Sequence, residues 1–407
     1  MNHRVLILSL ATGISVMGDG LAITAMMLDF HDRGTGGATI AALFLALAVP
    51  SVAVAGLAGR IADRVPLQKV LYGAGTALVL VCVTMAYARS VVITVLLTAV
   101  LAGLMAVVMP ATQKAVASST SDALLSKAQA RMSMSANMGM LLGPPIAGVL
   151  MDVADVRVAL LIDAVTYLAL PVSAWLLPPA APARSVRGRS GLVPGLRAIS
   201  AQPTLIRVIG LGLVIIFAMQ VTNVAEVFLV KDELHASSTA FGLITMVLAG
   251  GQLAGAWSAG VVLTRSGTPL SPSAVALIAV AATGVAVFLV SVSTRMDLVF
   301  VLTALNGLAL GGFAVARQTI LVRLTDSDLH GSVFAAHGAL LNTTVSAGLL
   351  MAGVMTALIG PRMVYAVTGL LLLASLTMTL LPGKLPRRSR EGSSPKADRA
   401  ATRAEHS

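Results

Sequence analysis

The sequence predicts an all-α membrane protein, with twelve transmembrane helices arranged as two pseudo-symmetric six-helix bundles. Hydrophobic residues make up 57% of its 407 residues and charged residues only 11%, whereas an ordinary soluble domain has about 25% charged residues. The mean hydropathy is +0.91. The apolar residues come in runs of about twenty, the length that an α-helix needs to cross a bilayer core about 30 Å thick. The two halves of the chain also resemble each other. No water-soluble fold could bury this much apolar surface.

The first six apolar runs form the N-terminal half, residues 1–178. The first run contains Asp19 and is longer than the apolar core of a signal peptide, which has about 7 to 15 residues, so it is read as a span. The spans of this half are Val5 to Asp29, Gly37 to Gly59, Gln68 to Ala88, Val91 to Thr112, Arg131 to Asp152 and Val156 to Pro178.

The remaining six runs form the C-terminal half, residues 207–381. Residues 179–206 include the longest internal polar connection, rich in Pro, Ala, Gly and Arg, and are predicted to link the halves. Residues 382–407 are charged, Ser-rich and nearly free of apolar residues, so this tail is predicted to be disordered. The spans of this half are Arg207 to Val230, Thr239 to Val262, Pro272 to Ser293, Asp297 to Gln318, Gly331 to Leu358 and Arg362 to Leu381.

The Lys and Arg residues indicate which side each loop faces. Twelve crossings put both termini on one side of the membrane, and short cytoplasmic loops keep Lys and Arg while short translocated loops do not. The loop from Gly59 to Lys69 carries three cations, which places it, the linker and both termini in the cytoplasm. Of the 28 Lys and Arg residues, only six then fall outside: Arg33, Arg89, Arg157, Lys231, Arg295 and Arg362.

The two halves match when Arg4 is set on Arg207, which brings Asp19 onto Thr222. Two parallel repeats, related by an axis along the membrane normal, place a substrate site where the halves meet near the midplane. Two further matches follow: Asp29 with Asp232, and Gly59, Asp63 and Arg64 with Gly260, Thr264 and Arg265.

The loop after the second span carries a motif of the major facilitator superfamily, Gly-x-x-x-Asp-Arg-x-Gly-Arg-Arg/Lys. Gly59, Asp63, Arg64 and Lys69 match this motif, while Pro66-Leu67-Gln68 replaces its central residues. The chain therefore resembles that superfamily over essentially all of the predicted spans. The resemblance implies a state-dependent latch, in which the Asp63 carboxylate meets the positive N-terminal end of span eleven, near Gly331.

A second motif lies in span five: Gly139-x-x-x-Gly143-Pro144-Pro145-Ile146-Ala147-Gly148. Its glycines allow close helix packing and its prolines bend the helix. It is similar to the antiporter motif of the superfamily, Gly-x-x-x-Gly-Pro-x-x-Gly-Gly, which is typical of exporters. With the segment from Pro110 to Asn137 and with Ile162-Asp163-Ala164, it resembles the branch of bacterial siderophore and macrolide exporters. One departure is the absence of the Arg that many drug:proton antiporters carry in span four.

Ionisable residues inside the spans are the first candidates for function, because each costs about 2.5 to 3.5 kcal/mol at a helix centre. Asp19 is the first choice, since it lies near the midplane by helical rise. Glu226 and Asp163 lie closer to the outer side and are candidate cavity or gate residues, although Asp163 could equally cap packing and Glu226 could snorkel. The polar candidates are Asn223, Asn306 and His337, together with Gln113, Gln220, Gln252 and Asn342, any of which could instead bond a neighbouring helix.

The resemblance and these residues together predict a proton-driven exporter of amphipathic small molecules, of drug, antibiotic or siderophore type, in a bacterial plasma membrane. The expected partners are the small-molecule substrate, protons and the lipid bilayer, and the protein is expected to act as a monomer. Nucleic acid is not expected, because the cations lie between spans and in the tail. No metal or cofactor is expected either, since the single cysteine, Cys82, lies in an apolar run and no phosphate-binding Gly-Lys-Ser/Thr motif occurs.

Two alternatives stay open at the level of the sequence. The first is an uptake permease for a sugar or another small polar nutrient, which the low aromatic content of 4% disfavours. The second is a membrane sensor or scaffold that transports nothing and would tolerate Asp19→Asn.

Overall fold

The computed structural model describes residues 3–118, 122–176, 192–265, 270–326 and 329–379. Within these ranges every regular element is a helix. Eleven of the helices are long and apolar enough to cross a membrane. The predicted all-α membrane fold is confirmed.

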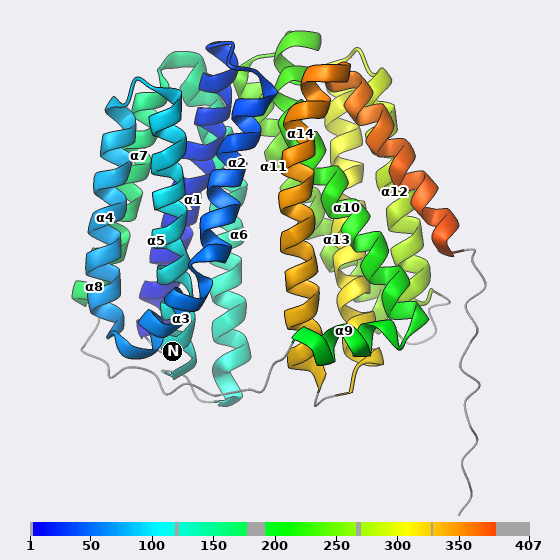
Figure 1. The fold of residues 1–407 in the computed structure, drawn as a ribbon, viewed down its shortest axis with the longest axis horizontal. Coiled ribbons are helices and arrows are strands. Elements are labelled where there is room, and N and C mark those ends of the chain that lie inside the picture. The colour runs from blue at the N-terminus through cyan, green and yellow to red at the C-terminus, as the bar shows by residue number, and fades with distance from the viewer. Residues whose placement is uncertain (1–2, 119–121, 177–191, 266–269, 327–328, 380–407) are drawn as a thin grey trace, which may run out of the picture.

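The N-terminal half contains all six predicted spans, two of which are broken (Figure 1). Span two divides near Val54, soon after Pro50, and span six divides at Leu168, just before Pro171. Proline lacks the amide donor that would continue the helical hydrogen bonds. The helices of this half are α1 (His3–Asp32), α2 (Gly36–Ala53), α3 (Ala55–Arg64), α4 (Leu67–Tyr87), α5 (Val91–Ser118), α6 (Asp122–Val153), α7 (Val156–Tyr167) and α8 (Ala169–Leu176).

The C-terminal half contains the other six spans, and the last two form one 46-residue helix, α14, that turns back at Gly360. Gly360 has φ 77° and ψ 163°, a conformation that only glycine adopts readily, and Pro361 follows it. At 1.5 Å per residue α14 would measure about 70 Å if straight, enough for two crossings. The helices are α9 (Leu192–Ser200), α10 (Pro203–Phe228), the π-helix η1 (Leu229–Glu233), α11 (Ser238–Thr264), α12 (Pro272–Val292), α13 (Met296–Leu324), α14 (His330–Ser375) and η3 (Leu376–Thr379).

The described part of the predicted linker, residues 192–206, forms α9 and the first turn of α10. Helix α9 packs against the start of α14. Gly195 lies so close to α14 that a Cβ there would overlap the carbonyl oxygen of Ser332, and Ile199 is buried. This end of the linker is therefore attached to the C-terminal half. Residues 177–191 and the predicted disordered tail lie outside the described residues.

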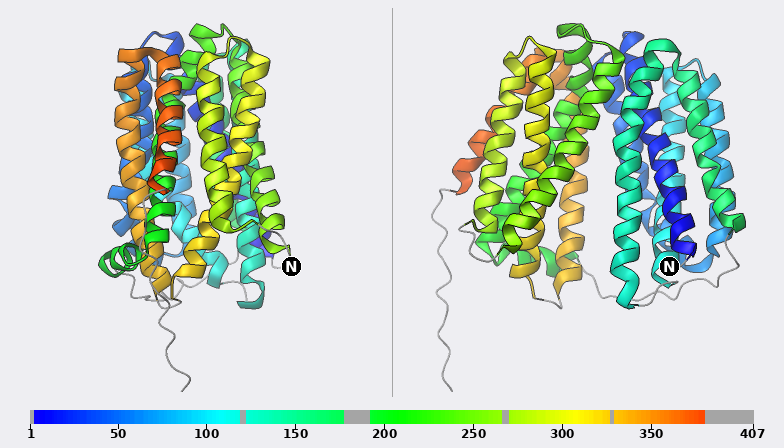
Figure 2. Two further views of the ribbon diagram at one scale, coloured as in Figure 1. Left: turned by 90° about the vertical axis from the view of Figure 1, so that its right-hand side faces the viewer. Right: turned by 180° about the vertical axis from the view of Figure 1, so that it is seen from behind.

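The helices define two ends of the molecule (Figures 1 and 2). We call the end with the start of α1, α3 and α9 the α3 face, and the end with the end of α1, η1 and the Gly360 turn the η1 face. The halves pack through two helix pairs, α6 with α11 and α2 with α14. In Figure 1 the ribbons of the halves meet toward the η1 face and diverge toward the α3 face.

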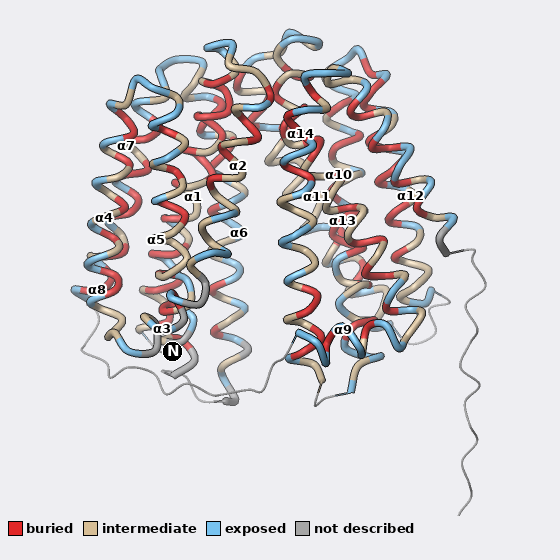
Figure 3. Tube along the Cα trace, in the orientation of Figure 1, coloured by how far each residue is buried: buried red, intermediate tan, exposed pale blue. Residues whose placement is uncertain are grey.

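Large apolar side chains cover the outside of both halves, while buried residues run through the centre of each (Figure 3). The two tryptophans, Trp175 and Trp257, have 76% and 73% of their surface exposed. In water such exposure would be unfavourable, whereas a bilayer and its interface accommodate it. The exposed apolar surface is therefore the lipid-facing surface of a multi-pass membrane protein.

Candidate functional site

Two carboxyl groups meet inside the N-terminal half, one from its first span and one from its last. Asp19 on α1 accepts a hydrogen bond from the hydroxyl of Tyr167, which is fully buried. Asp163 on α7 is 1% exposed, and it accepts hydrogen bonds from Cys82 Sγ at 3.4 Å and from Thr166 Oγ1 at 3.1 Å. Both carboxyl groups face the same cavity. They form one pair rather than two separate sites.

The close approach of α1 to α7 brings this pair together. Gly18 precedes Asp19, and a Cβ at Gly18 would overlap both Thr166 Oγ1 and Asp163 Oδ1. A residue without a side chain at this position therefore permits the two carboxylate-bearing helices to touch.

Both carboxyl groups line a cavity of about 300 Å³, which we call the carboxyl cavity. This volume lies at the lower end of the range for small-molecule sites. Apart from the two acids and the hydroxyls of Ser51 and Thr98, its walls are aliphatic or thioether side chains from α1, α2, α4, α5 and α7, among them Ile23, Met26, Met85, Leu101, Met105 and Met109. Flexible methionines suit ligands of variable shape. The cavity combines negative charge with apolar walls.

The glycine motif of α6 packs this helix onto α1 beside Asp19. A Cβ at Gly139 would lie 2.8 Å from the Met17 nitrogen, and one at Gly143 would lie 2.5 Å from the Met17 oxygen. Both distances are too short for any side chain. These two glycines therefore determine how α1 packs along α6.

The next part of the same motif packs α6 onto α11 of the other half. A Cβ at Gly148 would overlap the Ser238 oxygen, and on the α11 side Gly242 packs against the backbone of Pro144. The ring of Pro144 also faces Gly20 of α1. The motif therefore joins the helix that carries Asp19 to the C-terminal half.

In the C-terminal half the predicted residues lie around a much smaller cavity of about 30 Å³, the polar cavity. Glu226, Asn223 and Asn306 line it together with Tyr365 of α14. Asn223 Nδ2 donates to Gln220 Oε1 at 3.2 Å, while Asn306 Oδ1 is buried without a hydrogen-bond partner. The volume is about that of one water molecule, so the polar cavity is too small for an organic substrate.

A third cavity, the central cavity, has a volume of about 310 Å³ and lies between the halves, as the repeat predicts. Its walls come from α1, α2 and α6 on one side and from α10 and α11 on the other. It shares Ile23 with the carboxyl cavity, and it shares Glu226 and Asn223 with the polar cavity. The three cavities are therefore neighbours across the centre of the molecule.

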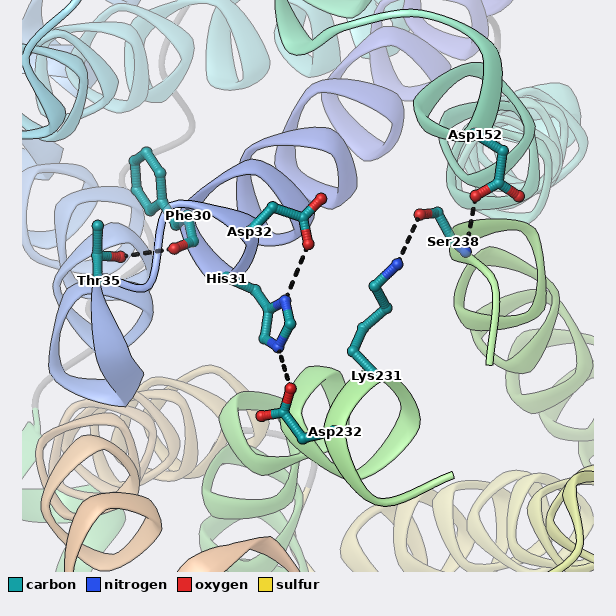
Figure 4. Close-up of polar contacts among 8 residues, drawn as sticks. All are labelled: Phe30, His31, Asp32, Thr35, Asp152, Lys231, Asp232 and Ser238. Atoms are coloured by element: carbon teal, nitrogen blue, oxygen red, sulfur yellow. Dashed lines mark hydrogen bonds and ion pairs between the residues drawn. The ribbon is translucent and has the colours of Figure 1, made fainter. Parts of the chain in front are cut away.

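Polar contacts hold the halves together at the η1 face (Figure 4). His31 of α1 contacts Asp32 through Nδ1 at 3.0 Å and Asp232 of η1 through Nε2 at 2.8 Å. Both partners are carboxylates, so both contacts are hydrogen bonds when the imidazole carries two protons.

A second polar connection lies beside the first. Asp152 of α6 accepts hydrogen bonds from the Ser238 nitrogen at 2.9 Å, from the Thr239 nitrogen at 2.9 Å and from Thr239 Oγ1 at 2.6 Å. Its carboxylate thus caps the N-terminus of α11, where the helix dipole is positive. Lys231 Nζ donates to Ser238 Oγ at 3.2 Å in the same cluster (Figure 4).

Comparison with known proteins establishes the family. The sequence model of the Major Facilitator Superfamily matches residues 8–229 and again residues 208–405. The chain belongs to the Major Facilitator Superfamily. It is a membrane transporter, and the two matches correspond to the two halves. No curated protein matches the sequence.

Several solved transporters share this fold at low sequence identity. A bacterial homologue of the human lysosomal transporter Spinster, in an inward-facing and unoccupied conformation, is 13% identical with a TM-score of 0.69, over 93% of this chain and 94% of that chain. The nucleoside transporter NupG is 15% identical with a TM-score of 0.72, over 93% and 99%. A POT family transporter in complex with a thioalcohol-conjugated peptide is 11% identical with a TM-score of 0.73, over 92% and 95%. Identities this low show the fold alone.

In the first-loop motif of this transporter, Gly59, Asp63 and Arg64 lie on α3, which packs against α5 and α2, and Lys69 lies on α4. Arg64 and Lys69 are exposed, while the surroundings of Gly59 and the side chain of Asp63 lie outside what the structure describes. The latch between Asp63 and the start of α14 therefore stays a prediction.

His337 lies in neither the carboxyl, the polar nor the central cavity. It is buried in α14, and the adjoining Ala336 belongs to a buried apolar cluster with Ile320 and Leu321 of α13. Of the six predicted coupling or substrate residues, the structure thus places Asp19 and Asp163 together, Glu226, Asn223 and Asn306 together, and His337 apart.

Sequence reasoning missed Tyr167, Cys82 and Tyr365. Tyr167 follows Asp163 by one helical turn and so lies on the same face of the helix, a signal that could have identified it. Cys82 contacts Asp163 from α4, and Tyr365 lines the polar cavity with Glu226 from α14. The sequence gives no sign that these residues come from different helices to the same places.

Proposed function

We propose that this transporter exports amphipathic, cationic small molecules in exchange for protons across a bacterial plasma membrane, with the α3 face in the cytoplasm. The observation that supports this most directly is the carboxyl cavity, in which two acids face an otherwise apolar space of about 300 Å³. Protons and organic cations are the ligands that such a site can hold in turn, because an ionised carboxylate in an apolar space needs a positive partner.

Competition for the carboxyl pair couples the two movements. A cationic substrate that enters from the α3 face stabilises the ionised pair and displaces its proton. When the transporter opens at the η1 face, protons from outside replace the substrate. Tyr167 and Cys82 hold the two acids in place through the hydrogen bonds described above. Exchange of one proton for one monovalent cation moves no net charge, so the membrane potential cancels and the pH gradient drives the exchange. Each unit of pH difference is worth about 1.4 kcal/mol, enough for a substrate gradient of about tenfold.

The α6 motif supports alternation between the two states. It packs both the Asp19 helix and α11 of the other half, so a tilt between the halves at the α6–α11 contact moves the helix that carries the acid. Rocking of two repeats around a site near the midplane is the common route to alternating access. The predicted boundaries at residues 178, 206 and 381 would then separate two rigid bundles from their connections.

Transport in proteoliposomes tests the proposal. Purified protein is reconstituted, a pH gradient of either sign is imposed, and movement of a lipophilic cation, a neutral analogue and a nucleoside is followed. We expect Asp19→Asn to abolish uphill movement of the cation while some downhill movement remains. Asp297→Asn serves as the matched control, because this exposed acid pairs with Arg295 at the η1 face and lines none of the three cavities.

Two outcomes would contradict parts of this proposal. Full uphill transport by Asp19→Asn would transfer the coupling role to Glu226 or Asp163. Accumulation of the nucleoside with the proton gradient, and no movement of the cation, would instead support the alternative of nutrient uptake.

A further inference from the structure

A buried cation lies inside the C-terminal half. Arg317 is in α13, seven residues before the end of this helix at the α3 face. The residue is only partly exposed, and its Nε atom is buried without a hydrogen-bond partner. Among the residues that the structure describes, no carboxylate pairs with it. An arginine inside a membrane-spanning helix, with no anion beside it, is costly and indicates function.

His337 adds a second unsatisfied group at the same place. It is 6% exposed, and neither ring nitrogen has a hydrogen-bond partner. The two helices meet here, because Ile320 and Leu321 of α13 share one buried apolar cluster with Val333 and Ala336 of α14. A neutral imidazole always has one N–H donor, so a donor here lacks an acceptor. Leaving a buried donor unpaired costs about 1 to 3 kcal/mol.

The surroundings hold the guanidinium in position. Its Cζ atom lies 5.8 Å from the centre of the Phe313 ring, one turn earlier on α13. On the other side, a Cβ at Gly212 of α10 would lie 3.5 Å from Arg317 Cδ and from one terminal nitrogen, so the side chain lies against the backbone of α10. Arg317 is therefore packed between the backbone of α10 and the Phe313 ring of its own helix.

We propose that Arg317 and His337 form a binding subsite for an anionic group, a carboxylate or a phosphate, carried by the transported molecule. Guanidinium and imidazole N–H groups are donors that match these anions, and an arginine fixed by packing loses little freedom when it binds one. This inference rests on the proposed export function and refines it, because the preferred substrate becomes a zwitterionic amphiphile rather than a simple cation.

The depth of the subsite gives it a place in the transport cycle. By helical rise, Arg317 lies about 10 Å from the α3-face end of α13, whereas Asp19 lies about 24 Å from the α3-face end of α1. A molecule that enters from the α3 face therefore meets the Arg317 subsite before the carboxyl cavity. The two sites bind opposite charges of the same molecule in succession.

The test uses three probes that share an indole ring: tryptamine, which is a cation, indole-3-propionate, which is an anion, and tryptophan, which is a zwitterion. Binding to the purified full-length transporter, in nanodiscs of neutral phosphatidylcholine, is measured by microscale thermophoresis. We expect Arg317→Gln to lower the affinity for indole-3-propionate and for tryptophan by about tenfold or more, since a hydrogen bond to a charged group is worth about 1.5 to 3 kcal/mol. The affinity for tryptamine should not change. His337→Asn should lower the affinity for the same two probes by a smaller factor.

Arg323→Gln is the matched control, because Arg323 lies on the same helix and is exposed. Equal affinity of indole-3-propionate for the parent protein and Arg317→Gln, or no binding to the parent protein, would overturn the proposal. Inorganic phosphate and nanodiscs that contain phosphatidylglycerol are tested as well, because they represent two other sources of an anion, a free anion and a lipid headgroup. If either one alone shows the Arg317 dependence and indole-3-propionate does not, the subsite holds a free anion or a lipid headgroup and the proposal is wrong.

Failure of the export proposal would look different. Asp19→Asn would then retain uphill transport, or tryptamine binding would not depend on Asp19, while the Arg317 dependence of anion binding would be unaffected.

Discussion

Asp19 and Asp163 are far apart in the sequence, and their meeting depends on one glycine. Each acid could be identified from the sequence alone as a functional candidate, because a charged residue inside a membrane span is energetically costly. Their pairing could not be predicted in the same way, because it depends on how closely α1 approaches α7 and therefore on the space at Gly18. Arg317 shows the same limit, because it lies inside the predicted span that ends at Gln318 and the sequence gives no sign that its Nε atom is buried without a hydrogen-bond partner.

At Gly18 we expect substitution by leucine to separate the two acids. The new side chain would overlap Thr166 and Asp163, and overpacking of this kind costs about 1 to 3 kcal/mol. Gly18→Leu should lower the thermal unfolding midpoint of the purified protein and weaken binding of a lipophilic cation. Gly73→Leu is the control, because no atom lies within 4 Å of a Cβ at Gly73. Equal loss of stability in both variants would show that the close approach at Gly18 is unimportant.

At the scale of elements, the apolar runs located all twelve spans but not where each helix ends. Polar residues continue α5 to Ser118 and begin α6 at Asp122, because a helix keeps its hydrogen bonds beyond the membrane core. The break between the predicted spans Gly331 to Leu358 and Arg362 to Leu381 contains Gly360, where α14 turns. Helix α9 was not predicted, since a short amphipathic helix on a Pro- and Arg-rich segment has no long apolar run to reveal it.

The α6 motif leads to a prediction about the contact between the halves. Gly148→Leu would force α6 away from Ser238 and Thr239 of α11, so the η1 face should open more often and export should slow at equal abundance. Distances between spin labels on α6 and α11, measured by double electron–electron resonance, would report the change. Gly250→Leu, at an open position on α11, should leave both distance and export unchanged. If Gly148→Leu leaves the distance between α6 and α11 unaltered, the motif does not control opening at the η1 face.

At the scale of the whole molecule, the halves are packed by α6–α11 and α2–α14, and the polar contacts of His31 and Asp152 reinforce that packing at the η1 face. The sequence predicted two bundles with a site between them. It could not predict which end of the molecule is closed, because that depends on contacts between residues from different halves.

Removing the Asp152 cap should favour opening at the η1 face. Asp152→Ala loses the acceptor for three hydrogen bonds from α11, each worth about 1 kcal/mol. We expect faster hydrogen–deuterium exchange at the start of α11 and a larger fraction of molecules open at the η1 face. Asp155→Ala, which removes the N-cap of α7 within one half, should change exchange in α7 alone. Exchange in α11 that matches the parent protein would count against a role for Asp152 in closure.

Orientation in the membrane can be tested by labelling from each side. Ser200, on α9, and Ser90, between α4 and α5, are both exposed and lie at opposite faces. We expect Ser200→Cys to react with an impermeant maleimide only from the cytoplasm and Ser90→Cys only from outside. The reverse pattern would invert the predicted topology and, with it, the direction assigned to the α3 face.

Cys82 makes such labelling possible in the natural chain. It is the single cysteine, it has no exposed surface, and its thiol lies against the Asp163 carboxyl group. The parent protein should therefore give a low background with impermeant reagents, without the cysteine-free variant that such studies usually need. A small, permeant thiol reagent would react with Cys82 only when α4 and α7 separate. The rate of that reaction, followed by mass spectrometry with and without a cationic substrate, would measure how often the wall around the carboxyl pair opens, using a probe that the protein already carries.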